Sequence, residues 1–139
     1  MKKMINHQEA TFVYVEDHLP SQTVMKLILR ELGYVGLTVF SDSHNFIGAI
    51  EQLAPEPNVF FLDIHVRPHT GFEMLKMLRE HPRFCNAFVI ALTASVMSDE
   101  IEMLREAGFD GVIGKPISEE SFEETLTRLL NGEQLWMID

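Results

Sequence analysis

Short apolar runs alternate along the chain with longer segments in which apolar residues recur every three or four positions. The first run, residues 11–15, is rich in β-branched and aromatic side chains, which favours a buried strand. A helix of about 13 residues is then predicted to begin near Pro20 and Ser21 and to end at Gly33, because these residue types start and stop helices. Its expected apolar face is formed by residues at helical spacing: Val24, Leu27, Ile28 and Leu32.

The same alternation of strand and helix continues to the end of the chain. Further strands are predicted at residues 35–40, 59–62, 87–92 and 111–113. Further helices are predicted at residues 43–53, 71–80 and 98–107, and from a Ser118 cap onward. The last helix carries Glu119 and Glu120 near the positive end of its dipole. Its apolar face is predicted from Phe122, Leu126, Leu129 and Leu130.

This strict alternation predicts the fold class. Consecutive strand–helix units with nearly all-apolar strands are typical of a parallel sheet that is covered by helices on both faces. With five strands, the commonest order is 2-1-3-4-5, in the flavodoxin-like arrangement. We therefore expect an α/β protein with a doubly wound five-stranded parallel sheet, whose ligand site lies at the carboxyl ends of the strands.

Length and composition restrict the class of protein further. The 139 residues, 46% of them hydrophobic, suit one compact domain, which we place at residues 10–131, with residues 132–139 as a tail or the start of a linker. No apolar run approaches the roughly 20 residues that span a bilayer, and the N-terminal residues do not form a secretory signal. We expect a soluble cytoplasmic protein without membrane contact. The net charge of -10 argues against binding to nucleic acid, and the single cysteine, Cys85, excludes an intrachain disulfide.

Polar residues directly follow four of the predicted strands. Glu16 and Asp17 follow the first strand, Asp63 the third, Thr93 the fourth, and Lys115 comes just after the fifth. In the order 2-1-3-4-5 the first and third strands are neighbours about 4.8 Å apart, so Asp17 and Asp63 should lie side by side. Thr93 lies one strand further, and the long lysine stem can reach back to Asp63. Three carboxyl groups, a hydroxyl and an ammonium group are thus expected at one place.

This combination indicates phosphoryl chemistry at a magnesium site. Three close carboxylates repel one another unless a cation is present, and Mg2+ prefers one or two carboxylates together with a phosphate. Asp63 is then a plausible nucleophile, because aspartate forms acyl phosphates in known enzymes. Mg2+, Lys115 and the Thr93 hydroxyl would stabilise the charge on the transferring phosphoryl group.

Four short motifs link the chain to a family: Val-Glu-Asp at 15–17, Phe-Leu-Asp-Ile at 61–64 followed by Gly71, Ala-Leu-Thr-Ala at 91–94, and Lys-Pro at 115–116. In this order and at strand ends, they resemble the receiver domains of two-component response regulators, the CheY-like family, over roughly residues 10–131. The resemblance implies the CheY-like (βα)5 form of the predicted fold. It also implies phosphorelay signalling, in which the chain catalyses only its own phosphorylation and dephosphorylation and is not otherwise an enzyme.

The resemblance assigns a role to each candidate residue. Asp63 would be the phosphoacceptor, and Asp17 the direct Mg2+ ligand beside it. Glu16 would act on the metal through water, and the backbone carbonyl of His65 would be the third protein ligand. The remaining assignments make Thr93 the switch hydroxyl, Lys115 the phosphate-pairing lysine, and Pro116 the second residue of a cis Lys-Pro bond.

Three departures from the family pattern are visible. The acidic pair is Glu16-Asp17 in place of the commoner Asp-Asp. The proline usual in the loop after the phosphoacceptor comes one residue later, as Pro68. Val112 occupies the position three residues before the lysine, where the family usually has Tyr or Phe. The ring rotation that reports phosphorylation in the family therefore has no ring here. The chemistry itself does not depend on that ring.

The resemblance also implies partners. A histidine kinase or a histidine phosphotransfer protein would supply the phosphoryl group. A downstream protein or a second copy of the chain would bind the face formed by helix 98–107, the fifth strand and the last helix. The alternative is a pseudo-receiver, a protein-interaction module that never takes phosphate. Neither a flavodoxin phosphate loop nor a GxxxxGK[ST] nucleotide loop is present in the sequence.

Overall fold

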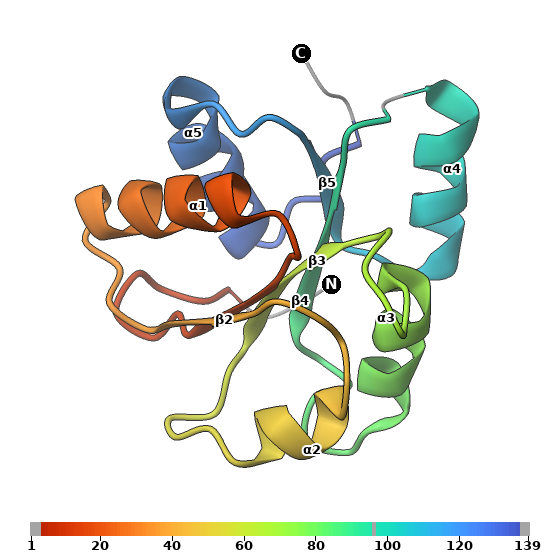
Figure 1. Cartoon of the computed structure of the whole chain (residues 1–139). Coiled ribbons are helices and arrows are strands. Elements are labelled where there is room, and N and C mark those ends of the chain that lie inside the picture. The colour runs from red at the N-terminus through yellow and green to blue at the C-terminus, as the bar shows by residue number, and fades with distance from the viewer. Residues whose placement is uncertain (1–3, 96, 137–139) are drawn as a thin grey trace.

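The computed structural model describes residues 4–95 and 97–136. In this part of the chain, five parallel strands form one sheet in the order β2-β1-β3-β4-β5 (Figure 1). The strands are β1 (Phe12–Val15), β2 (Leu37–Phe40), β3 (Val59–Asp63), β4 (Phe88–Thr93) and β5 (Gly111–Gly114). The helices are α1 (Leu19–Glu31), α2 (Phe46–Glu51), α3 (Gly71–Glu80), α4 (Ser98–Ala107) and α5 (Glu119–Leu130). The predicted α/β class, the doubly wound parallel sheet and its strand order are confirmed.

The helices cover the sheet on both sides, with α1 and α5 on one side and α2, α3 and α4 on the other (Figure 1). The central strands β1, β3 and β4 are buried along their whole length. In β1, Phe12 and Tyr14 belong to the core on the α1/α5 side, whereas Val13 and Val15 belong to the core on the α2/α3/α4 side. Residues two apart share a face of a strand. Tyr14 therefore projects to the same side as Glu16, the first residue after β1.

The buried face of α1 differs from the predicted one. Val24 and Leu27 are 39% and 50% exposed, and Met25 and Leu29 are buried in their place, together with Ile28. The two sets of residues have the same helical spacing and are shifted by about one position around the helix, so periodicity alone does not decide between them. The packing of Met25 and Leu29 against the core under α1 and α5 decides it.

Two predicted elements begin later than expected. The strand predicted at 35–40 begins at Leu37, because Val35 is 99% exposed and lies outside the sheet. The helix predicted at 43–53 is confined to Phe46–Glu51. The Ser43 hydroxyl accepts a hydrogen bond from the His69 backbone N–H and donates one to the His69 carbonyl, both at 2.6 Å, which ties residue 43 to a distant loop. Asn45 then takes a left-handed conformation, with φ of 52°, before the helix begins.

The other helices agree with the sequence more closely. The helices α3 and α4 have the predicted bounds, 71–80 and 98–107. Ser118 holds the predicted cap position of α5, but its side chain makes no capping hydrogen bond. Thr70 and Glu73 form a reciprocal capping box at the start of α3. No helix among the described residues is both long enough and apolar enough to cross a membrane.

Candidate functional site

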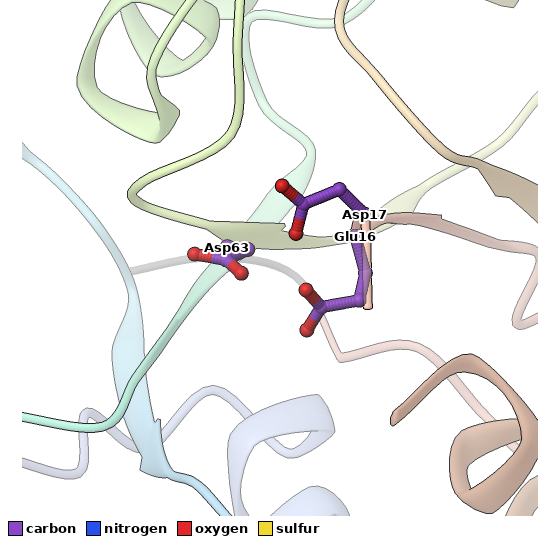
Figure 2. A group of neighbouring side chains, drawn as sticks. All are labelled: Glu16, Asp17 and Asp63. Carbon is purple, nitrogen blue, oxygen red and sulfur yellow. The ribbon is translucent and has the colours of Figure 1, made fainter. Parts of the chain in front are cut away.

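Three carboxyl groups meet at the carboxyl ends of β1 and β3. Asp63 is the last residue of β3, and Glu16 and Asp17 follow directly after β1, the neighbouring strand. Figure 2 shows the three side chains around one space, and their nearest carboxylate oxygens all lie within 4.8 Å of one another. Glu16 is fully buried and Asp63 nearly so, at 6% exposed, whereas Asp17 is exposed to solvent. The structure therefore brings these residues together as the strand order predicts.

Lys115 reaches this cluster from the far edge of the sheet. Its ammonium nitrogen lies 2.7 Å from Glu16 Oε1 and 3.0 Å from Asp63 Oδ2. The Lys115 backbone N–H donates to the carbonyl of Thr93 at 2.9 Å, which fixes the start of the side chain at the end of β4. The peptide bond between Lys115 and Pro116 is cis, as predicted. The lysine stem thus crosses the ends of β4 and β3, and one cation neutralises part of the charge of two carboxylates.

Glu16 has further contacts, which were not predicted from the sequence. The Tyr14 hydroxyl donates to Glu16 Oε1 at 2.9 Å, the oxygen that also lies next to the Lys115 ammonium. The His18 backbone N–H donates to Glu16 Oε2 at 3.3 Å, and the Gln22 amide donates to the Glu16 carbonyl at 2.6 Å. Both carboxylate oxygens of Glu16 are therefore engaged within the protein. The two-residue spacing of Tyr14 and Glu16 on one strand is the sequence signal that could have indicated the contact.

The electrostatics of the cluster favour a charged Asp63. Burial acts to raise the pKa of this carboxyl, but hydrogen bonding with Glu16, with the His65 backbone N–H and with Lys115 brings the pKa below its usual value. Burial and the neighbouring Asp63 raise the pKa of Glu16. The pKa of Lys115 is raised, because its two carboxylate partners outweigh the effect of burial. Burial and the nearby Glu16 also raise the pKa of the Tyr14 hydroxyl, which stays protonated as a donor.

The loop after Asp63 is held close to the site. The His65 backbone N–H donates to Asp63 Oδ1 at 2.9 Å, so this carboxylate has a donor on each oxygen. Gly71 passes close to the same loop: a Cβ at this position would lie 2.8 Å from the Ile64 Cα, so a side chain here would force the backbone apart. This close approach explains the glycine in the Asp63 motif. The predicted metal ligation by the His65 carbonyl remains a prediction.

Thr93 lies at the end of β4, buried and paired in the sheet with Gly114 of β5. Its hydroxyl accepts a hydrogen bond from the Ser95 backbone N–H at 3.0 Å and donates to the Ser95 carbonyl at 3.2 Å. The hydroxyl is thus turned toward its own loop. Val112, at the position where an aromatic residue is usual in the resembled family, is buried in the core on the α2/α3/α4 side of the sheet.

The cluster fits a hard divalent cation. Its donors are all carboxylate oxygens, which Mg2+ prefers, and one of the three residues, Asp17, is open to solvent, so that water can complete the coordination. Among the residues that the structure describes, the Lys115 ammonium is the one cationic group that forms an ion pair with Glu16 and Asp63.

Comparison with known proteins gives a consistent result. The sequence model of the response regulator receiver domain matches residues 12–127. The polar-differentiation response regulator DivK of Brucella anthropi is 30% identical over 118 residues, which cover 84% of this chain and 92% of that protein. The stress response regulator protein 1 of Meyerozyma guilliermondii is 25% identical over 114 residues, covering 81% of this chain and 52% of that protein.

Solved structures share the fold. The chemotaxis response regulator CheY4 of Vibrio cholerae superposes with a TM-score of 0.77 at 21% identity, covering 86% of this chain and 98% of that one. The receiver domain of a sensor histidine kinase from Pseudomonas aeruginosa superposes with a TM-score of 0.73 at 23% identity, covering 87% of this chain and 98% of that one. The latter structure has a magnesium ion coordinated in its active site cleft.

Proposed function

The chain belongs to the response regulator receiver domain family, and we propose that it accepts a phosphoryl group on Asp63 in a two-component phosphorelay. One observation carries the proposal: Asp63 is a nearly buried carboxylate whose two oxygens are oriented by the His65 N–H and the Lys115 ammonium. The lowered pKa keeps this carboxylate charged, which is the form that attacks phosphorus.

The transfer is a displacement at phosphorus. A carboxylate oxygen of Asp63 forms a bond to the phosphorus of a phosphohistidine on the partner, and the bond between phosphorus and the histidine nitrogen breaks. The leaving imidazole keeps the electron pair of that bond and takes up a proton from solvent. Lys115, next to Asp63 in the resting chain, pairs with the oxygens of the incoming phosphoryl group. Thr93 follows Leu92, the β4 partner of Asp63, so its hydroxyl is placed to leave Ser95 and donate to the same group.

Asp17 and Asp63 would hold Mg2+ directly, together with the His65 carbonyl, and Glu16 would act on it through water. When bound, the ion neutralises the charge that accumulates on the phosphoryl oxygens during transfer. Glu16 has a second task in this proposal, because its Oε1 holds the Lys115 ammonium beside Asp63. The contacts from Tyr14 and His18 keep that carboxylate in place.

The phosphorelay needs a donor of the phosphoryl group and a partner that responds to it. A histidine kinase or a histidine phosphotransfer protein donates the phosphoryl group, and a downstream protein or a second copy of the chain reads the result on the surface of α4, β5 and α5. The chain acts in the cytoplasm as a phosphoacceptor that catalyses only its own phosphorylation and dephosphorylation. Receiver domains as a family interact with histidine kinases and with downstream partners, which supports this assignment.

A phosphate-independent interaction module is the second candidate. The observation that favours it is Val112, which lacks the ring that usually follows the movement of the threonine in the family. The cluster of Glu16, Asp17, Asp63 and Lys115 counts against it, since a module without phosphoryl chemistry has no need to keep three carboxyl groups and an ammonium group together. Labelling with a small phosphodonor, followed by intact mass measurement, separates the two candidates.

A further inference from the structure

The segment that follows α5 runs back along the outer edge of the sheet. Gly132 reverses the chain with a positive φ of 94°, and the Arg128 guanidinium holds Glu133 with hydrogen bonds of 3.0 and 3.1 Å. Leu135 then forms a parallel bridge with Gly111, and its carbonyl accepts the Val112 N–H at 3.2 Å. The segment thus pairs with the free edge of β5.

The two apolar residues of this segment lie on opposite sides of the sheet. Leu135 packs against the core under α1 and α5, and Trp136 packs against the core under α2, α3 and α4. Because Leu135 pairs with Gly111, the next residues, Trp136 and Val112, are neighbours on the same face. An aromatic side chain is therefore present beside the fifth strand after all, supplied by a different segment.

The edge of β5 is shaped for close approach. A Cβ on Gly111 would lie 2.5 Å from Leu129 Cδ2 and 3.4 Å from the Leu135 carbonyl oxygen. A side chain at this position would make the Leu129 side chain of α5 shift, whereas the Leu135 carbonyl lies at an ordinary van der Waals distance. The absence of a side chain on Gly111 thus makes room for Leu129 of α5 at the residue with which the segment pairs.

The segment is held weakly. Its strand pairing consists of the isolated Gly111–Leu135 bridge, and both Leu135 and Trp136 are half-buried. The Trp136 indole N–H is buried but has no hydrogen-bond partner in the part of the chain that the structure describes. A buried donor without an acceptor costs free energy that is recovered when the group returns to water. The docked position is therefore one from which Trp136 can be released.

A physical path connects this segment to the site. Thr93 pairs with Gly114 of β5, and its hydroxyl holds the backbone of Ser95 just before α4. The helix α4 is anchored by one buried residue, Leu104, which belongs to the same core as Trp136. A movement of Thr93 toward Asp63 would break its hydrogen bonds with Ser95, and a shift of α4 would then move Leu104 within the core against which Trp136 packs.

We propose that residues 134–136 are a latch on the β5 edge, docked in the unphosphorylated chain and released when Asp63 is phosphorylated. Release exposes the edge of β5 and the part of the sheet next to α4 that the indole covers. The inference rests on the proposed phosphorylation for its trigger, whereas the docked state rests only on the contacts of Leu135 and Trp136.

Trp136 is the single tryptophan of the chain, so its fluorescence reports the latch directly. With Mg2+ and phosphoramidate, the emission should shift to longer wavelength and acrylamide quenching should increase about twofold or more, as the indole enters water. The Asp63→Asn variant, treated in the same way, should keep the wild-type emission. Intact mass measured on the same samples records whether Asp63 has been phosphorylated.

Two variants test the docked state without any phosphodonor. Leu135→Glu places a charge in the core under α1 and α5 and should give the shifted emission at once. Gln134→Glu makes the same change of charge on the exposed neighbour and should leave the emission as in the wild type. Equal emission from Leu135→Glu and wild type would overturn the docking.

Phosphorylated wild type with unchanged emission and quenching would overturn the latch and leave the proposed function intact. Failure of the wild type to take a phosphoryl group would overturn the proposed function and, with it, the trigger of the latch. A shift in the phosphorylated wild type that Asp63→Asn lacks supports both.

Discussion

The Tyr14 hydroxyl donates a 2.9 Å hydrogen bond to Glu16 Oε1, the same oxygen that lies 2.7 Å from the Lys115 ammonium. A residue in the middle of β1 thus fixes the carboxylate that holds a lysine from the end of β5. Tyr14 is fully buried and its hydroxyl stays protonated, so the donor is present over the whole physiological pH range. The position of the Lys115 ammonium at Asp63 therefore depends on a core side chain that acts through Glu16.

Removing this hydroxyl should slow phosphorylation. In Tyr14→Phe the Glu16 carboxylate loses one donor, so Lys115 is held less firmly beside Asp63. A hydrogen bond of this kind contributes roughly 0.5–1.5 kcal/mol, which predicts a rate about 2- to 10-fold lower with phosphoramidate and Mg2+. Tyr34→Phe is the matched control, because Tyr34 is the other tyrosine of the chain and stacks on His7 away from the site. Equal rates for the two variants would assign Tyr14 a packing role alone.

Magnesium affinity should depend on Asp17 more than on Glu16. Asp17→Asn removes a charged and solvent-accessible ligand, and should weaken Mg2+ binding about tenfold or more. Glu16→Gln should weaken binding less, because Glu16 is turned toward Lys115 and acts on the metal through water. Calorimetric titration with MgCl2 measures both constants. A larger loss in Glu16→Gln would show that Glu16 is the direct ligand.

Lys115 should stabilise the fold in a defined pH window. The raised pKa of Lys115 means that its contribution is present below about 10.5 and is lost as the pH rises through the pKa of the folded state. The lowered pKa of Asp63 means that its contribution is present above 3.8 and is lost as the pH falls through the folded-state pKa. The pair therefore stabilises the chain between these limits, where both groups are charged.

The Lys115→Ala variant leaves two buried carboxylates without their counter-charge. Its free energy of unfolding should be about 2–3 kcal/mol lower than that of the wild type at pH 7 without Mg2+. The difference should shrink at pH 3, where carboxyl groups protonate. Urea unfolding at both pH values checks this, with Lys76→Ala on the exposed side of α3 as the control. A deficit that is equally large at pH 3 would mean that the lysine stem, and not its charge, supports the fold.

The strand order and the site residues at the carboxyl ends of the strands could be predicted from the sequence. Once the strand order is set, the residues at the carboxyl ends of β1, β3, β4 and β5 must lie at the same end of the sheet. Asp17, Asp63 and Lys115 do meet there. The contact of Tyr14 with Glu16 follows from the same alternation but was missed, because a tyrosine in an apolar strand was interpreted as a core residue only.

The rest depended on contacts between distant segments. The start of α2 is set by the hydrogen bonds of Ser43 with His69, which no local pattern reveals. The predicted buried face of α1 was wrong at Val24 and Leu27, because two apolar stripes with the same period compete and packing decides between them. The docking of Trp136 beside Val112 requires the pairing of Leu135 with Gly111, and a single bridge leaves no strand pattern in the sequence.

Phosphorylation of Asp63 can be tested most directly by intact mass after incubation with Mg2+ and phosphoramidate. The wild type should gain one phosphoryl group, and hydroxylamine should remove it, as expected of an acyl phosphate. Asp63→Asn should gain none. Asp42→Asn changes an exposed aspartate just after β2, at the same carboxyl end of the sheet, and should be labelled like the wild type. Equal labelling of the wild type and Asp63→Asn, or no labelling of the wild type, would contradict the proposed function.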